Sequence, residues 1–300
     1  MTVNFRKALA VSATATLFAT GASATSIDVS FTNNASGGDI FFTPIFTALH
    51  NGNFDTFTAG STANAALESV AEDGAVGGAI SNAEAAGAVA GAILGTDGAS
   101  GSFNGAGQPP LFEPGETSTL NLDASTLAGG PVYFSFLSMI LPSNDFFIGN
   151  DDPLSIQLLN ASGEFLGTNG VLEFDVLYSS VYDAGTELNS VANSSGVLEN
   201  APFVFGSAQG PGQSNVGPDE NGVVRNVAST AGLNLANLIG TETPGGLIEF
   251  VPSGASGNNV LGSFRIEVTP TPVPLPAAAP LLVAALGGMA FVARRKRKLS

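Results

Sequence analysis

The sequence predicts an all-β fold, an antiparallel β-sandwich with a short helical excursion at about residues 62–94 and a single C-terminal transmembrane helix. Several segments alternate apolar and polar residues with a period of two, which indicates strands that bury one face. Clusters of Gly, Asn, Asp and Ser separate these segments, as turns require. The chain also holds 38 Gly and 17 Pro without a collagen-like period, so that turn-rich β structure is expected.

The expected strands occur within residues 25–268, which we interpret as one folded domain. Residues 26–32 alternate isoleucine, valine and phenylalanine with polar residues, and residues 264–268 repeat this pattern near the end of the domain. Residues 132–141 are dense in apolar and aromatic residues, and residues 172–178 alternate again. These four segments predict strands of an antiparallel sandwich.

One Ala-rich stretch breaks the strand pattern. Residues 62–72 have apolar residues near helical spacing, and Ser61 or Thr62 is the expected N-cap of a short helix laid on the sandwich. Residues 83–94 are richer in glycine, and each glycine costs a helix about 1 kcal/mol. Two interpretations stay open for this second segment, a helix or a mobile loop, and residues 206–222 are expected to form a surface loop.

The charges are distributed very unevenly along the chain. All 25 acidic residues lie within residues 28–267, where Arg225 and Arg265 are the only lysine or arginine residues, so this region has a net charge of −23. Such a domain cannot neutralise phosphates, which excludes nucleic acid as a partner and makes anionic membrane surfaces poor partners. The absence of cysteine excludes disulfides, thiolate nucleophiles and cysteine-ligated metals.

The N-terminus has the three regions of a secretory signal peptide. Arg6 and Lys7 precede the mostly apolar residues 8–19, and Ala22 and Ala24 form a small-x-small cleavage site. The alternative is a buried N-terminal helix, which does not require the three regions to occur in this order. We therefore expect residues 1–24 to direct the protein to the export machinery and to be removed.

The C-terminus is predicted to be a membrane anchor. Residues 269–276 are Pro-rich and expected to be extended. Residues 277–293 are uncharged and apolar, about 25 Å long as a helix, at the short end of what spans a bilayer. Residues 294–300 hold five basic residues, which place this end in the cytoplasm and the acidic domain outside.

This tail resembles the PEP-CTERM class of bacterial sorting signals, in its VPLPA variant. The motif consists of Val273, Pro274, Leu275, Pro276 and Ala277. The resemblance implies recognition by an exosortase, a membrane protease that removes the tail during export. The mature protein would then lie at the cell surface or in the extracellular matrix, in a setting of polysaccharide. The alternative is a simple anchor that is never cut.

Four segments of the domain resemble the bacterial branch of the spondin N-terminal domain family. They are residues 42–44, 67–74, 138–149 and 182–187, and the similarity covers most of the domain. The resemblance implies an antiparallel β-sandwich similar to calcium-dependent lipid-binding modules. It also implies a role in adhesion or extracellular matrix. The partner stays open, because adhesion to extracellular polysaccharide, to another surface protein or to nothing specific would leave similar sequences.

The same resemblance implies a calcium ion held by three acidic side chains. Two of these positions correspond to Asp145 and Asp183, and the third corresponds to Thr126 in an ungapped alignment or to Asp123 after a shift of three residues. Calcium takes 6–8 oxygen ligands, and a divalent ion would relieve the self-repulsion of so acidic a domain. The alternative is that Asp145 and Asp183 only cap turns, which aspartate commonly does.

An enzyme is not expected. The single histidine, His50, has no thiol partner, and the three lysines lie outside the mature domain, which removes phosphate-loop, Schiff-base and Ser-Lys mechanisms. Glu187, Asp151 and Asp152 are further candidate metal ligands. We therefore expect an exported, non-catalytic interaction protein that binds calcium, and the alternative is a secreted metal-dependent hydrolase that uses loop carboxylates.

Overall fold

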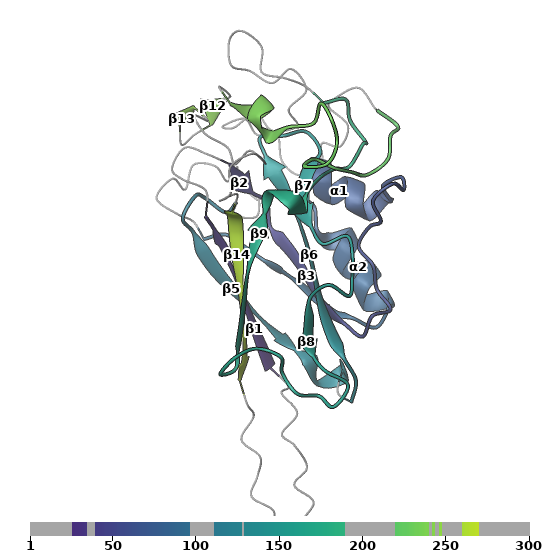
Figure 1. Cartoon of the computed structure of the whole chain (residues 1–300), viewed down its shortest axis with the longest axis vertical. Coiled ribbons are helices and arrows are strands. Elements are labelled where there is room, and N and C mark those ends of the chain that lie inside the picture. Colours follow the sequence, from purple (N-terminus) through teal and green to yellow (C-terminus); the bar gives the residue numbers. More distant parts are fainter. Residues whose placement is uncertain are drawn as a thin grey trace, which may run out of the picture. The chain divides into compact units, whose positions relative to one another are not determined.

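Two antiparallel β-sheets enclose the main core in this computed structural model (Figure 1). The structure describes residues 26–34, 40–96, 111–127, 129–189, 220–239, 242–243, 246–247 and 260–269. Every strand pairing within these residues is antiparallel. The prediction of an all-β fold built from two packed sheets is therefore confirmed.

The smaller sheet has four strands in the order β5-β1-β14-β9. Its strands are β1 (Ser26–Asn33), β5 (Thr117–Asp123), β9 (Val171–Leu177) and β14 (Val260–Thr269). Ile27, Val29 and Phe31 are fully buried while their neighbours in β1 are partly exposed, so this strand has the predicted alternation. The polar residues of all four strands cover the outer face, where Ser30 and Thr119 are hydrogen-bonded at 2.7 Å.

The larger sheet follows the order β11-β10-β7-β6-β3-β4, with β2 and β8 also paired to β6. Its strands are β2 (Phe41–Phe42), β3 (Ile45–His50), β4 (Val89–Ile93), β6 (Val132–Leu141), β7 (Phe146–Gly149), β8 (Gln157–Leu159), β10 (Val181–Asp183) and β11 (Arg225–Asn226). A separate small pair is formed by β12 (Glu242–Thr243) and β13 (Gly246–Leu247).

Two short helices cover the outer face of the larger sheet, α1 (Ala65–Asp73) and α2 (Gly77–Ala85). Leu67 and Val70 of α1 join a second core cluster with Phe46 and Phe147 of the sheet. Strand β6 is therefore buried on both faces, against the smaller sheet on one side and against α1 on the other. This double burial explains why residues 132–141 are apolar at nearly every position instead of alternating.

The helical excursion differs from the prediction in two respects. The cap of α1 is Asn64, whose Oδ1 accepts hydrogen bonds from the amides of Ala66 and Leu67 at 3.0 and 2.9 Å, so neither Ser61 nor Thr62 caps it. The Ala-Gly segment 83–94 is neither one helix nor a loop. Its first residues end α2, and the remainder forms β4, which pairs with β3.

Several predictions fall on residues outside the described part of the chain. They concern the signal peptide 1–24, the Pro-rich motif, the helix at 277–293, the basic tail and most of the loop 206–222. Among the residues that the structure does describe, no helix is both long and apolar enough to cross a membrane.

Candidate metal centre

The turn between β6 and β7 places the carboxylate of Asp145. Ser143 fixes this turn, since its amide donates to the Ile140 carbonyl at 3.0 Å and its Oγ accepts from the amide of Phe146 at 3.2 Å. The Nδ2 of Asn144 reaches across to the carbonyl of Leu188 at 2.7 Å. Asp145 is thereby held directly before β7, and its side chain is fully buried.

Asp183 is the last residue of β10, which pairs with β7. Its partner in the register is Phe146, and the amide of Ala184 donates to the carbonyl of Asp145 at 3.2 Å. The two predicted aspartates therefore lie at the adjacent ends of two paired strands. Both have 0% exposure, so the structure brings them together inside the protein.

Both carboxylates accept hydrogen bonds from the loop that follows β10. Asp183 Oδ1 accepts from the amide of Gly185 at 2.7 Å, and Asp145 Oδ2 accepts from the amides of Thr186 and Glu187 at 3.1 and 3.2 Å. These are turn-capping contacts, of the kind that the alternative to metal binding expects. They account for one oxygen of each carboxylate.

The second oxygens differ in their surroundings. Asp183 Oδ2 accepts from Asn189 Nδ2 at 2.6 Å and from an Arg225 guanidinium nitrogen at 3.2 Å, which also contacts Glu220 Oε1 at 2.6 Å. Asp145 Oδ1 is buried and has no hydrogen-bond partner among the described residues. A buried acceptor without a partner is destabilising, and the described residues supply neither a hydrogen bond nor a cation to this oxygen.

The electrostatics of the pair point in the same direction. Burial raises the pKa of Asp145 well above its ordinary value, and the neighbouring charge of Asp183 raises it further. The backbone amides of Glu187 and Thr186 oppose this shift only in part. Arg225 gives Asp183 a counter-charge, whereas no described basic residue forms an ion pair with Asp145. A divalent cation would supply the counter-charge that Asp145 lacks.

A cleft of about 230 Å³ lies beside this pair, between α1 and the loops 185–186 and 221–222. Glu68 and Glu72 of α1 line it together with Thr186. Burial raises the pKa of Glu72 to about 7, although the hydroxyl of Thr186 lowers it, and the nearby Glu187 adds to the increase. The acidic character of the region therefore extends from the aspartate pair to the end of α1.

Asp123 does not join the other two predicted ligands. It is exposed and lies at the end of β5, opposite Ser26 at the start of β1. The other end of β1 approaches the β6–β7 turn, because Asn33 Nδ2 donates to the carbonyl of Ile40 and the following strand, β2, pairs with the last residues of β6. Seven residues of strand, about 23 Å, separate these two ends. The side chain of Asp123 caps its own turn through the amide of Ser125 at 3.0 Å.

The other candidate metal ligands, Asp151, Asp152 and Glu187, also form hydrogen bonds within the protein. Asp151 Oδ1 accepts from the amide of Ala59 at 2.6 Å, and Asp152 Oδ1 accepts from the amide of Leu154 at 2.9 Å. Glu187 is buried next to the pair and donates its amide to Asp145. Among the described residues there is no group of three or more His, Cys, Asp or Glu side chains arranged to hold a metal. A cation at this place would therefore take most of its ligands from backbone carbonyls and water.

Sequence reasoning missed the contribution of Arg225 and Glu72. Arg225 is one of only two arginine or lysine residues in a domain with 25 acidic residues. This scarcity could have indicated that the carboxylates paired with Arg225 belong to the site. From the sequence, Glu72 is expected to be an exposed helix residue. In the structure only 3% of it is exposed, because it lies at the end of α1 that faces the loop after β10.

His50 is a packing residue, as a lone histidine usually is. Its Nδ1 accepts from the amide of Gly52 at 3.1 Å, which leaves the hydrogen on Nε2 to face Ser135 Oγ at 3.0 Å. Ser135 is therefore the acceptor, the reverse of what activation of a serine nucleophile requires. Burial lowers the pKa of His50 to about 4.

Comparison with known proteins adds nothing to this description, because neither a family model nor a curated protein matches the sequence.

Proposed function

We propose that this protein is an exported, non-catalytic interaction module whose loops are organised by one calcium ion at Asp145 and Asp183. The observation that carries the proposal is the fully buried Asp145 Oδ1, which no described protein group satisfies. Calcium prefers carboxylate, carbonyl and water oxygens, and it suits a site of irregular loop geometry. The spondin-like segments agree with the proposal, since they contain both aspartates.

The burial of the pair favours a structural ion over a catalytic one. A hydrolytic metal needs an open coordination position that a substrate can reach. Both aspartates have 0% exposure. This argues against the secreted hydrolase and supports a role in which the ion holds the loop after β10 against the end of β7.

The export part of the proposal depends on the two ends of the chain. The signal peptide and the VPLPA tail would carry the acidic domain across the inner membrane and release it through an exosortase. Extracellular polysaccharide or another surface protein would then be the partner. The polar outer face of the smaller sheet is compatible with a hydrated setting for the domain.

The test is thermal unfolding of the mature domain in EDTA and in millimolar calcium. We expect calcium to raise the Tm, and Asp145→Asn to abolish this shift because it removes a charged ligand from the site. Asp123→Asn is the matched control, since it removes an equal charge from an exposed turn at the far end of β1 from the site. Identical melting curves of the unmodified domain in EDTA and calcium would refute the calcium site.

A second measurement covers the case in which Asp145→Asn fails to fold. Calcium titration calorimetry on Asp183→Asn, which changes the other carboxylate of the pair, should show at least about a tenfold loss of affinity. Unchanged affinity in this variant would place the ion elsewhere.

A further inference from the structure

The two sides of the sandwich are closed differently. On one side, the edge strand β5 packs against β4 of the other sheet. On the opposite side, β9 pairs with β14 through one edge. On its other edge Val171 is bridged to Thr168, and among the described residues no strand pairs with the rest of that edge. Unpaired backbone N–H and C=O groups on such an edge are a template for another strand.

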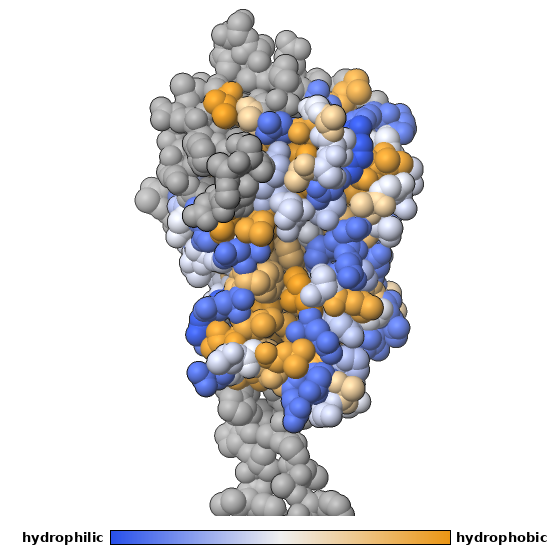
Figure 2. Space-filling view, in the orientation of Figure 1, coloured by the Kyte–Doolittle hydropathy of each residue, from blue (hydrophilic) through white to orange (hydrophobic). Residues whose placement is uncertain are grey.

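Apolar side chains are accessible beside this edge. Leu172 and Phe174 of β9 are only partly buried, and the ring of Phe174 stacks on Phe264 of β14 at 5.2 Å. Leu177 at the end of β9 is 42% exposed. Figure 2 shows apolar surface gathered in the middle of this face, where Figure 1 shows β9 and β14.

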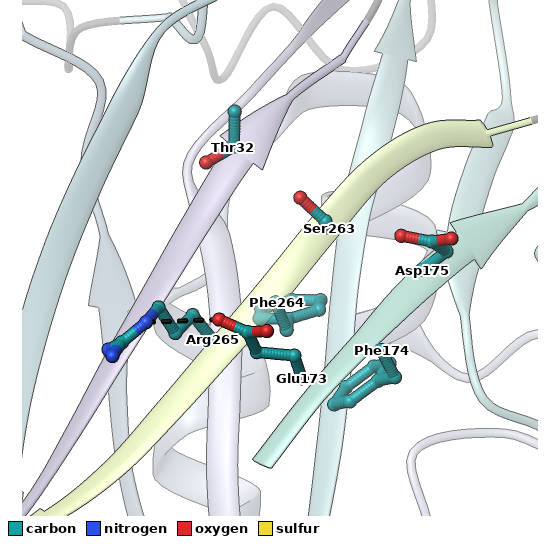
Figure 3. Close-up of a pocket in the computed structure, with 7 residues that line it drawn as sticks. All are labelled: Thr32, Glu173, Phe174, Asp175, Ser263, Phe264 and Arg265. Carbon is teal, nitrogen blue, oxygen red and sulfur yellow. Dashed lines mark ion pairs between the residues drawn. The ribbon is translucent and has the colours of Figure 1, made fainter. Parts of the chain in front are cut away.

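The outer face of the same edge is acidic. Glu173 and Asp175 are exposed and alternate with the apolar residues of β9. They line a pocket of about 550 Å³ over β9 and β14, in which the ion pair of Arg265 with Glu173 at 3.1 Å is visible (Figure 3). Arg265 also contacts Glu267, so that this one cation is shared between two carboxylates.

These charges disfavour a second copy of the chain as the occupant. In an antiparallel pair, residues that lie directly opposite each other project from the same face of the sheet. Pairing of β9 with a second β9 about Phe174 puts Glu173 opposite Asp175, and the neighbouring registers that keep the faces matched put Glu173 or Asp175 opposite itself. Every such register places acid against acid, which is destabilising.

We propose that the free edge of β9 binds an extended peptide segment of a partner protein in which basic and apolar residues alternate. Basic side chains would face Glu173 and Asp175, and apolar ones would extend the strip formed by Leu172 and Phe174. The backbone would supply the affinity, and the alternating side chains the selectivity, as in other cases of strand addition. The proposal extends the interaction role argued above but does not require the calcium site.

The experiment uses a labelled seven-residue peptide of alternating valine and lysine, the length of β9, titrated into the mature domain. We expect saturable binding, and new protection from hydrogen exchange at the amides of Glu173 and Asp175, which face the edge of β9 away from β14. Asp175→Lys should weaken binding by about tenfold, since it turns a favourable cross-strand pair into a repulsive one. Glu84→Lys, an equal charge change on the exposed face of α2, should leave the affinity within about twofold.

Several results would overturn the proposal. Equal losses in both variants would mean that the peptide responds only to net charge. Equal binding of a peptide with its lysines grouped at one end would exclude strand pairing. A domain that sediments as a dimer through β9 would show that a second copy occupies the edge.

The peptide titration and the thermal unfolding measurement are both carried out in EDTA and in calcium. Peptide binding without any effect of calcium on the Tm would refute the calcium site alone. A calcium effect without peptide binding would refute the strand site alone.

Discussion

Replacement of Gly185 by alanine tests whether the loop after β10 is built as tightly as the structure indicates. Gly185 has φ +67°, a left-handed conformation that costs an alanine about 1–2 kcal/mol. A Cβ at this position would lie 2.5 Å from the carbonyl oxygen of Val223 and 2.8 Å from its nitrogen. Those are backbone atoms, so the loop segment before β11 would have to move.

The cost of the left-handed conformation and the cost of the clash with Val223 can be separated by a matched variant. Forced displacement in a packed region typically costs about 1–3 kcal/mol, so Gly185→Ala should lower the free energy of unfolding by about 2–5 kcal/mol in total. Gly87 has φ +82°, and a Cβ there would meet nothing within 4 Å. Gly87→Ala should therefore lose only the conformational part, about 1–2 kcal/mol.

Urea unfolding at constant pH measures both variants, because a lower midpoint at unchanged m reports stability alone. A second readout is the calcium shift of the Tm. Since residues 186 and 187 donate their amides to Asp145, Gly185→Ala should reduce that shift, and Gly87→Ala should preserve it. Equal losses of stability in the two variants would mean that the segment containing Val223 yields freely, and the packing argument would be wrong.

Three further predictions concern pH and processing. The pKa of Glu72 is about 7 in the folded protein against an ordinary 4.5, so the folded state binds more protons between these two pH values. The free energy of unfolding should therefore fall as pH rises from 4.5 to 7. The urea midpoint of Glu72→Gln should not show this fall. The pKa of His50 is about 4 in the folded protein against an ordinary 6.5, so the unfolded state binds more protons between these two pH values. The free energy of unfolding should therefore fall as pH drops from 6.5 to 4. His50→Gln should remove this loss. Mass spectrometry of surface protein should find a C-terminus upstream of Leu281, and an intact tail would contradict sorting by an exosortase.

The periodicity of the sequence predicted the strands that have one face in water. β1 and β9 alternate because their outer faces are solvated, and their bounds agree with the expected segments within one residue. Composition, not periodicity, predicted β6, because a strand covered on both faces is apolar at nearly every position.

Periodicity did not predict β4, because this strand consists mainly of small residues and does not alternate apolar with polar side chains. A Cβ at Gly91 would lie 2.8 Å from a methyl group of Leu120, a residue of β5 in the opposite sheet. Small residues at this point let the two sheets approach each other. An Ala-Gly segment therefore forms a strand here, although its local preferences indicate a helix or a loop.

The candidate site was predictable only as far as its turns. Asp145 and Asp183 could be paired through the resemblance of their turns to those of a known family. The positions of Glu72 and Arg225 depend on how α1 and β11 dock around the loop after β10, and that is a property of tertiary packing. Asp123 failed to join them because strand direction places it at the far end of β1.

The distribution of the two domain arginines leaves Asp145 without a basic partner, which is why we propose the metal ion at this residue. Arg265 is shared between Glu173 and Glu267 on the outer face of the smaller sheet, and Arg225 between Asp183 and Glu220 beside the site. No other lysine or arginine occurs between residues 28 and 267, so neutralisation of Asp145 falls to a proton or to an external cation.

These two modes of neutralisation compete for one carboxylate, and the competition is measurable. Burial and the charge of Asp183 raise the pKa of Asp145, so calcium bound at the proposed site would have to displace a proton when the pH lies below that value. Calcium affinity should then increase with pH, and calorimetry in buffers of different ionisation enthalpy should detect proton release on binding. Turn capping alone predicts neither effect, because a carboxylate that only accepts backbone amides has no reason to exchange its proton for a metal ion.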